Sequence, residues 1–69
     1  MNIVNIAPDQ SQTVMTHEEL LILTAALNEI CNGIDIFEFQ TRIGSDRERV
    51  VRLLKEMGSL LEKMSVAKV

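Results

Sequence analysis

The spacing of apolar positions changes at residue 16 and divides the chain into two parts. Before it, the β-compatible run IVNI at residues 3–6 precedes a polar stretch that Pro8 interrupts. We interpret residues 1–15 as a flexible tail or as one edge strand, for which a second copy of the chain would supply the pairing strand. From residue 16 onward apolar residues recur at helical spacing. This pattern predicts a helical domain over residues 16–64.

The first helix is predicted over residues 17–31. Thr16 and Glu19 have the spacing of a capping box, in which each side chain accepts a hydrogen bond from the backbone N–H of the other residue. The pair Asn32-Gly33 is typical of a left-handed helix end. The apolar residues that follow the cap at helical spacing form the predicted core face: Leu20, Leu23, Leu27, Ile30 and Cys31.

A second helix is predicted over residues 36–43. Asp35 and Glu38 repeat the capping pattern with an acidic cap, and Gly44 ends the element. The core positions that we expect from this helix are Ile36, Phe39 and Ile43.

A third helix is predicted to begin after Ser45 or Asp46. Its apolar residues recur every four and three positions: Val50, Leu54, Met57, Leu61 and Met64. Gly58 interrupts this run, and a glycine inside a helix costs about 1 kcal/mol of stability relative to alanine. The sequence SLLE that follows is another capping pattern. The pattern therefore allows one long helix or a third helix and a short fourth. Residues 65–69 are predicted to fray. The predicted fold class is all-α, a small three- to four-helix domain, with a short N-terminal edge strand as the alternative to a tail.

Residues 36–55 resemble the helix-turn-helix superfamily. Apolar residues stand five and one positions before Gly44 and six and nine positions after it: Phe39, Ile43, Val50 and Leu53. We expect these four residues to lie in the core. The chain departs from the family pattern at Gln40, where a small residue is usual, and at Ser45, where an apolar residue is common. The resemblance implies a three-helix core in which Arg47, Arg52 and Lys55 point outward from the second helix of the motif.

The charge is unevenly distributed. Residues 42–55 carry five basic and two acidic side chains, a net charge of +3, whereas the rest of the chain carries −6. The candidate nucleic-acid contacts are Arg47, Arg49, Arg52 and Lys55. The isoelectric point near 4.9 and the acidic Asp46 and Glu48 at the start of this helix argue against DNA. We favour the alternative that Glu48 and Arg52 pair with each other on a solvated helix face.

The sequence contains no recognisable catalytic set. His17 is its only histidine and Cys31 its only cysteine, so the chain cannot form an internal disulfide or assemble a zinc site. We expect no enzymatic activity, no metal, no cofactor and no small-molecule substrate. No apolar run approaches the roughly 18 residues of a membrane span, and the first residues lack the features of a secretory signal. We therefore expect a cytoplasmic protein with no membrane association.

Surplus apolar residues indicate a binding function. If one face of the second helix is buried, Phe37 projects from the other, near Ile22, Val51 or a partner, or it lies buried under the N-terminal segment. Leu60, Leu61 and Met64 extend the third helix beyond the reach of the others, which predicts a homodimer. The sequence thus predicts a small non-enzymatic interaction or regulatory protein that self-associates and binds a protein partner. The alternative is a dimeric helix-turn-helix DNA-binding transcriptional regulator.

Overall fold

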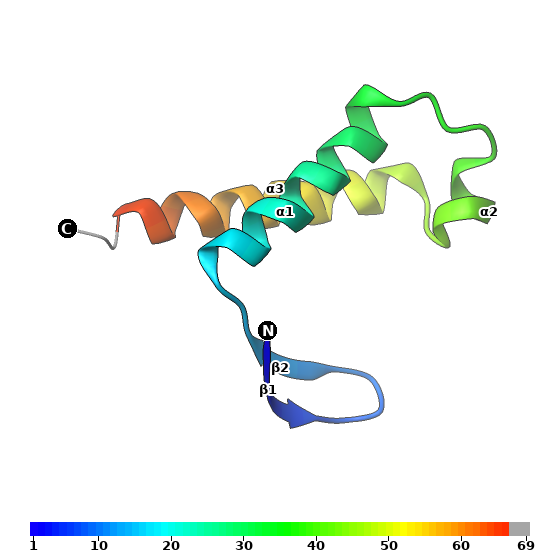
Figure 1. The fold of residues 1–69 in the computed structure, drawn as a ribbon. Coiled ribbons are helices and arrows are strands. Elements are labelled where there is room, and N and C mark those ends of the chain that lie inside the picture. The colour runs from blue at the N-terminus through cyan, green and yellow to red at the C-terminus, as the bar shows by residue number, and fades with distance from the viewer. Residues whose placement is uncertain (67–69) are drawn as a thin grey trace.

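The structure, a computed structural model, describes residues 1–66 (Figure 1). The elements follow one another as β1 (Asn2–Ile6), β2 (Ser11–Val14), α1 (His17–Asn28), the π-helical turn η1 (Glu29–Gly33), α2 (Phe39–Ile43) and α3 (Arg47–Val66). α1 and α3 pack across each other and form the helical body. The β-hairpin projects from the start of α1, and the short α2 lies at the other end of the body (Figure 1). No described helix is long and apolar enough to cross a membrane.

The all-α prediction is wrong, because the N-terminal segment folds into a two-stranded antiparallel sheet. β1 pairs with β2, and the register joins Asn2 to Val14 and Ile6 to Ser11, with an irregularity between Ile3 and Asn5. The chain is therefore a mixed fold, although most of its described residues are helical. The Pro8-Asp9 pair between the strands is a turn signal. The second strand was missed because its residues are mostly polar.

Three helix termini form as the local sequence predicts: the start of α1, the end of α2 and the start of α3. Thr16 and Glu19 form the predicted capping box at the start of α1. Gly44 ends α2 in the left-handed region at φ +88°, and its N–H donates to the Gln40 carbonyl at 2.8 Å. The Asp46 carboxylate caps α3, since it accepts from the N–H of Arg49 at 2.9 Å. α3 then continues through Gly58 to Val66, which settles the choice between one helix and two.

Two other predicted helix ends are wrong. α1 does not stop at a left-handed glycine but widens into η1, in which the N–H of Ile34 donates to the Glu29 carbonyl five residues earlier. The predicted capping pair of Asp35 and Glu38 does not form. Glu38 itself lies in the left-handed region, with φ 53°, and immediately precedes α2. A residue in that conformation cannot belong to a helix, so α2 starts at residue 39 rather than 36. Of the predicted C-terminal fray, residues 65 and 66 are helical, and residues 67–69 lie outside the described part.

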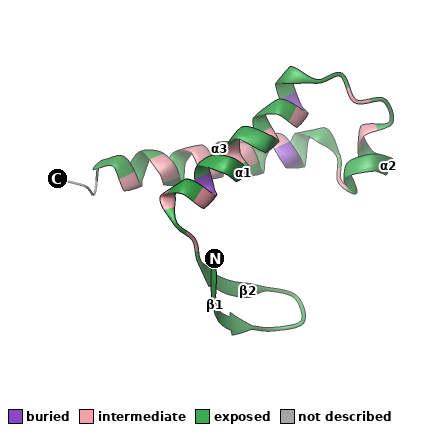
Figure 2. Ribbon diagram, viewed as in Figure 1, coloured by how far each residue is buried: buried purple, intermediate pink, exposed green. Residues whose placement is uncertain are grey.

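The core is small. Only Leu20, Cys31 and Val50 are buried among the described hydrophobic residues (Figure 2). Six predicted core residues are half-buried: Leu27, Ile30, Ile36, Phe39, Leu54 and Met57. Three are exposed, contrary to the prediction: Leu23, Ile43 and Leu53. The reason is that the crossing of α1 and α3 covers one stripe of each helix, while α2 makes at most marginal contact with either.

Candidate interaction surfaces

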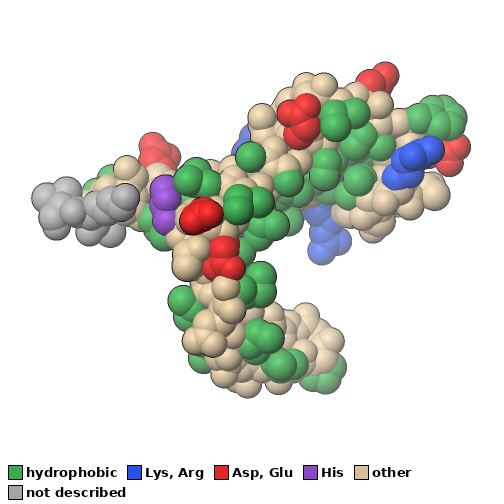
Figure 3. Space-filling model, viewed as in Figure 1, with side chains coloured by type: hydrophobic (Ala, Val, Ile, Leu, Met, Phe, Trp, Pro, Cys, Tyr) green, Lys and Arg blue, Asp and Glu red, His purple; other side chains and the backbone are tan. Residues whose placement is uncertain are grey.

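α1 carries apolar side chains on all of its sides, but α3 covers only one of these sides. Its sequence HEELLILTAALN buries Leu20 against the body and leaves Leu21, Ile22 and Leu23 exposed, with Ile22 60% exposed. A helix that is hydrophobic all round is normally an interior helix. Figure 3 shows hydrophobic side chains running along this part of the body and recurring on the hairpin. α1 therefore presents an apolar surface that the chain itself leaves open to solvent.

The hairpin has no core of its own. Every residue of β1 and β2 is exposed, including Ile3, Val4, Ile6 and Val14. An isolated two-stranded hairpin is at best marginally stable in water, because it has no hydrophobic face packed on another layer. The hairpin stands away from the helical body in the space-filling view (Figure 3). By this rule the two strands alone contribute little to the stability of the chain.

Two open depressions lie between the hairpin and the helices, and we name them together the hairpin groove. The larger has a volume of about 500 Å³ and is lined by Thr13, Val14, Met15, Leu20, Leu60 and Met64. The smaller, of about 190 Å³, is lined by Met1, Met15, Glu19, Ile22 and Leu23. Met15 lines both depressions and so connects them. Apart from Glu19 and Thr13, all these side chains are apolar.

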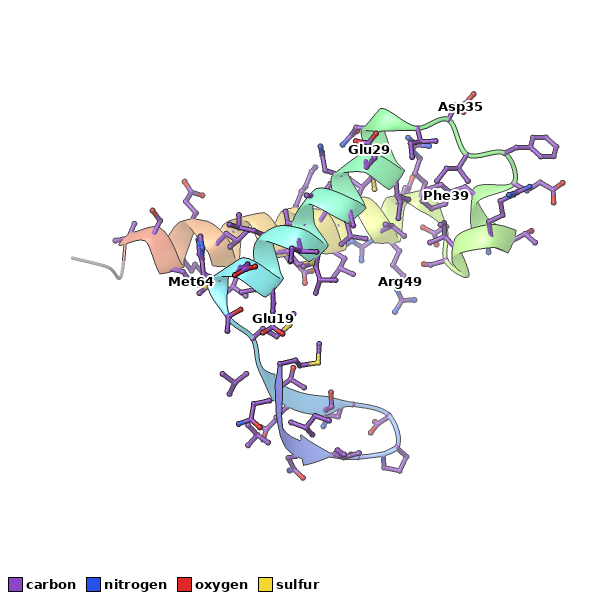
Figure 4. The ribbon with its side chains drawn as sticks, viewed as in Figure 1. Glu19, Glu29, Asp35, Phe39, Arg49 and Met64 are labelled. Carbon is purple, nitrogen blue, oxygen red and sulfur yellow. The ribbon has the colours of Figure 1, made fainter. Side chains whose placement is uncertain are left out.

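Hydrogen bonds at Glu19 fix the base of the hairpin on α1 (Figure 4). The N–H of Thr16 donates to the Glu19 carboxylate at 2.9 Å, and the N–H of Glu19 donates to the Thr16 hydroxyl at 3.1 Å. The amino group of Met1 also contacts this carboxylate. The Met1 ammonium first, and then the Thr16 backbone and hydroxyl, hold the pKa of Glu19 below its ordinary value of 4.5. Both ends of the hairpin are thereby tied to the start of α1.

Arg47 joins three segments at the opposite end of the body. From the start of α3 its guanidinium donates to the Cys31 carbonyl of η1 and lies over the ring of Phe39 in α2. Cys31 is the most buried side chain, as expected for a small hydrophobe. Arg47 was a candidate for contacts with nucleic acid. In the structure its guanidinium has partners within the chain.

The remaining basic candidates divide between two sides of α3. A shallow depression of about 390 Å³ is lined by Arg47, Glu48, Val51, Arg52 and Lys55. Arg49 does not line it, and its side chain extends from α3 toward the side of the hairpin (Figure 4). The expected pair of Glu48 and Arg52 does not form, since the ion pair between Met1 and Glu19 is the only one within residues 1–66.

The candidate protein-interface residues lie on separate surfaces. Phe37 is 76% exposed in the turn before α2, so the alternative of burial under the N-terminal segment is wrong. Ile22 lines the hairpin groove, and Val51 lines the shallow depression on α3 beside Arg52 and Lys55. The structure therefore does not bring Phe37, Ile22 and Val51 together. Leu60 and Met64 do meet, in the hairpin groove. Leu61 is half-buried in α3.

Sequence reasoning missed the hairpin side of this groove. The sequence predicts a tail or one edge strand for the segment that contains Val14 and Met15. Their position opposite Leu60 and Met64 depends on the unpredicted pairing of β1 with β2. The available signal was the turn pair Pro8-Asp9 between two segments that contain β-branched residues.

Residues 1–66 contain no group of three or more histidine, cysteine, aspartate or glutamate side chains placed to hold one metal ion. Comparisons with models of known protein families, with curated proteins and with solved structures found no match to this chain.

Proposed function

We propose that this chain is a small non-enzymatic interaction protein, which works as a homodimer and presents its outer surface to a protein partner. The observation that carries the proposal is the area that a single copy leaves in contact with water. The accessible surface of the chain is 5726 Å². A compact monomer of 7.8 kDa is expected to expose about 4,400 Å².

The excess of about 1,300 Å² has the size of one side of a stable interface. Standard complexes bury about 800 Å² per partner, and obligate homodimers bury more. The shape agrees with the area, because the radius of gyration is 13.8 Å and a compact chain of this length is expected at about 11 Å. The exposed surface includes large apolar side chains of α1 and the hairpin, together with Leu60.

Self-association is tested by sedimentation equilibrium at chain concentrations from micromolar upward. We expect a dimer in the wild type and a shift to monomer in a Leu60→Glu variant. Leu60 is 46% exposed, so one copy accommodates the charge without losing its fold. The matched control is Ser59→Glu, which adds the same charge to the neighbouring exposed position. A wild type that stays monomeric throughout would overturn the homodimer.

The protein partner is inferred from Phe37. An aromatic side chain that is 76% exposed is a typical anchor of a protein interface, where Tyr, Trp and Phe are enriched. Phe37 lies in the turn before α2, away from the hairpin groove, so a dimer built through the groove leaves it free for a partner. Photo-cross-linking in cells, with p-benzoylphenylalanine at position 37, tests this surface, and the same label at the exposed Val66 is the control. A discrete product at position 37 alone supports it. Identical patterns from both positions would exclude Phe37 as an anchor.

A second candidate function is DNA binding by a dimer through the basic side chains of α3. The observation that favours it is the grouping of Arg52 and Lys55 with Arg47 around one depression of α3. A mobility shift on nonspecific duplex DNA tests this candidate. Binding at low salt that weakens steeply as salt rises, and that Arg52→Ala with Lys55→Ala removes, is expected of a DNA-binding protein. No shift at about 50 mM salt excludes it.

A further inference from the structure

We propose that the β-hairpin is an exchanged arm, and that the hairpin of one copy docks in the hairpin groove of a second copy. This inference rests on the homodimer proposed above and specifies how it is built. An isologous dimer requires a surface that is complementary to itself. The chain carries both halves of such a surface, an apolar arm and an apolar groove at the base of that arm.

The chemistry of the arm fits the groove. β1 and β2, with the sequences NIVNI and SQTV, contain no charged side chain. Docking them against apolar side chains therefore requires no burial of an unpaired charge, which would be expensive. The groove contributes Met15 and Met64, and methionine side chains adapt readily to the shape of what they cover.

The arm of the same copy cannot fill its own groove. Thr13 and Val14 of β2 form one wall of the larger depression, while Leu20, Leu60 and Met64 form the rest of its lining. The outer part of the hairpin, which includes Ile6 and the turn, stands away from the helical body (Figures 1 and 3). The docking element must therefore come from another molecule, and a second copy offers a hairpin whose two strands carry no charged side chain.

Stability favours the same arrangement. A two-stranded hairpin becomes stable when a further layer covers one of its faces. Reciprocal docking gives each hairpin such a layer, and it covers the exposed side of Ile22 and Leu60 at the same time. Two hairpins are buried per dimer, which is consistent with the excess of about 1,300 Å² per copy over a compact monomer.

The first test compares two variants by sedimentation equilibrium. Ile6→Thr removes apolar surface from the outer part of the arm and keeps a β-branched residue that suits a strand. Val66→Thr is the matched control, because Val66 at the end of α3 is 70% exposed and Ile6 is 71% exposed. Since each dimer holds two copies of Ile6, we expect Ile6→Thr to raise the dimer Kd about tenfold or more, with little change in Val66→Thr.

The second test needs no substitution. A 1:1 mixture of isotope-labelled and unlabelled wild-type protein gives filtered NOEs that arise only between copies. We expect intermolecular NOEs from the methyl groups of Ile3 and Ile6 to those of Leu60 and Met64. A dimer without such NOEs, or with a Kd unaffected by Ile6→Thr, overturns the exchanged arm while the homodimer stands. A wild type that is monomeric overturns both. If the groove methyl groups of a dimer give NOEs to the hairpin of neither copy, the groove has a different occupant, and this result also overturns the inference.

Discussion

The guanidinium carbon of Arg47 lies 5.4 Å from the centre of the Phe39 ring. The same guanidinium donates a hydrogen bond to the carbonyl of Cys31, so one side chain of α3 holds both η1 and α2. α2 is five residues long and makes little other contact with the helical body. Its position therefore depends on this one arginine more than on apolar packing.

Arg47→Ala is expected to lower the free energy of unfolding by about 1–3 kcal/mol, because it removes a cation–π contact and a hydrogen bond from a charged donor. Arg47→Lys should recover part of the loss, since lysine keeps the charge but not the planar guanidinium. Urea denaturation at one fixed chain concentration measures both. Arg52→Ala, at an exposed position of the same helix, is the control and should stay within about 0.5 kcal/mol of the wild type. Equal effects of the two alanine variants would show that the Arg47 contacts contribute nothing to stability.

Gly44 and Gly58 are expected to respond in opposite directions to alanine. Gly44 has φ +88°, a conformation that disfavours any residue with a Cβ, so Gly44→Ala should destabilise the protein by about 1–2 kcal/mol. Gly58 lies within the continuous α3, and a Cβ there would meet nothing within 4 Å. Gly58→Ala should therefore stabilise the protein by about 1 kcal/mol. Thermal and urea unfolding measure both values. A destabilising Gly58→Ala would indicate that α3 is interrupted at that position.

The sequence predicts the features that depend on local interactions, and it fails for those that depend on contacts between distant segments. The Thr16 capping box and the stop at Gly44 were predicted correctly, because each depends on residues within one turn. The start of α2 was not predicted correctly, because it depends on a contact between distant residues, that of Phe39 with Arg47. Between η1 and this contact, Glu38 takes a left-handed conformation. The exposure of Leu53 was missed for a similar reason. Its spacing is that of a core residue, but α2 is too short and too loosely held to cover it.

The hairpin groove illustrates the same limit at the candidate site. Leu60 and Met64 were assigned to an interface from their position beyond the reach of the other helices, and the structure places both in the groove. The opposing wall depends on the pairing of β1 with β2. That pairing joins a β-compatible run to the polar segment SQTV, and SQTV has no alternation of apolar and polar residues that would predict a strand.

The stabilising contribution of Glu19 is expected to depend on pH. Contact with the Met1 ammonium and hydrogen bonds from Thr16 lower the pKa of Glu19 in the folded state below the ordinary value of 4.5. The charged form therefore favours folding above pH 4.5, and this advantage is lost as the pH falls through the lower folded-state pKa. Urea unfolding of the wild type and of Glu19→Gln, from pH 7 to pH 2, should give free energies that differ most at high pH and converge at low pH. A constant difference across this range would contradict the assignment.

Leu20 and Leu21 are neighbours of identical chemistry in very different environments. Leu20 is 6% exposed within the α1–α3 contact, and Leu21 is 48% exposed. Leu20→Ala should lower the free energy of unfolding by about 2–5 kcal/mol, the range for buried leucine, because it opens a cavity in a core of three buried side chains. Leu21→Ala should cost less than about 1 kcal/mol, because the side chain already lies largely in water. Both variants are compared by urea denaturation at two chain concentrations. If the two losses are similar, and the loss in Leu21→Ala grows with concentration, Leu21 is covered by a second copy and the dimer interface extends around α1 beyond the hairpin groove.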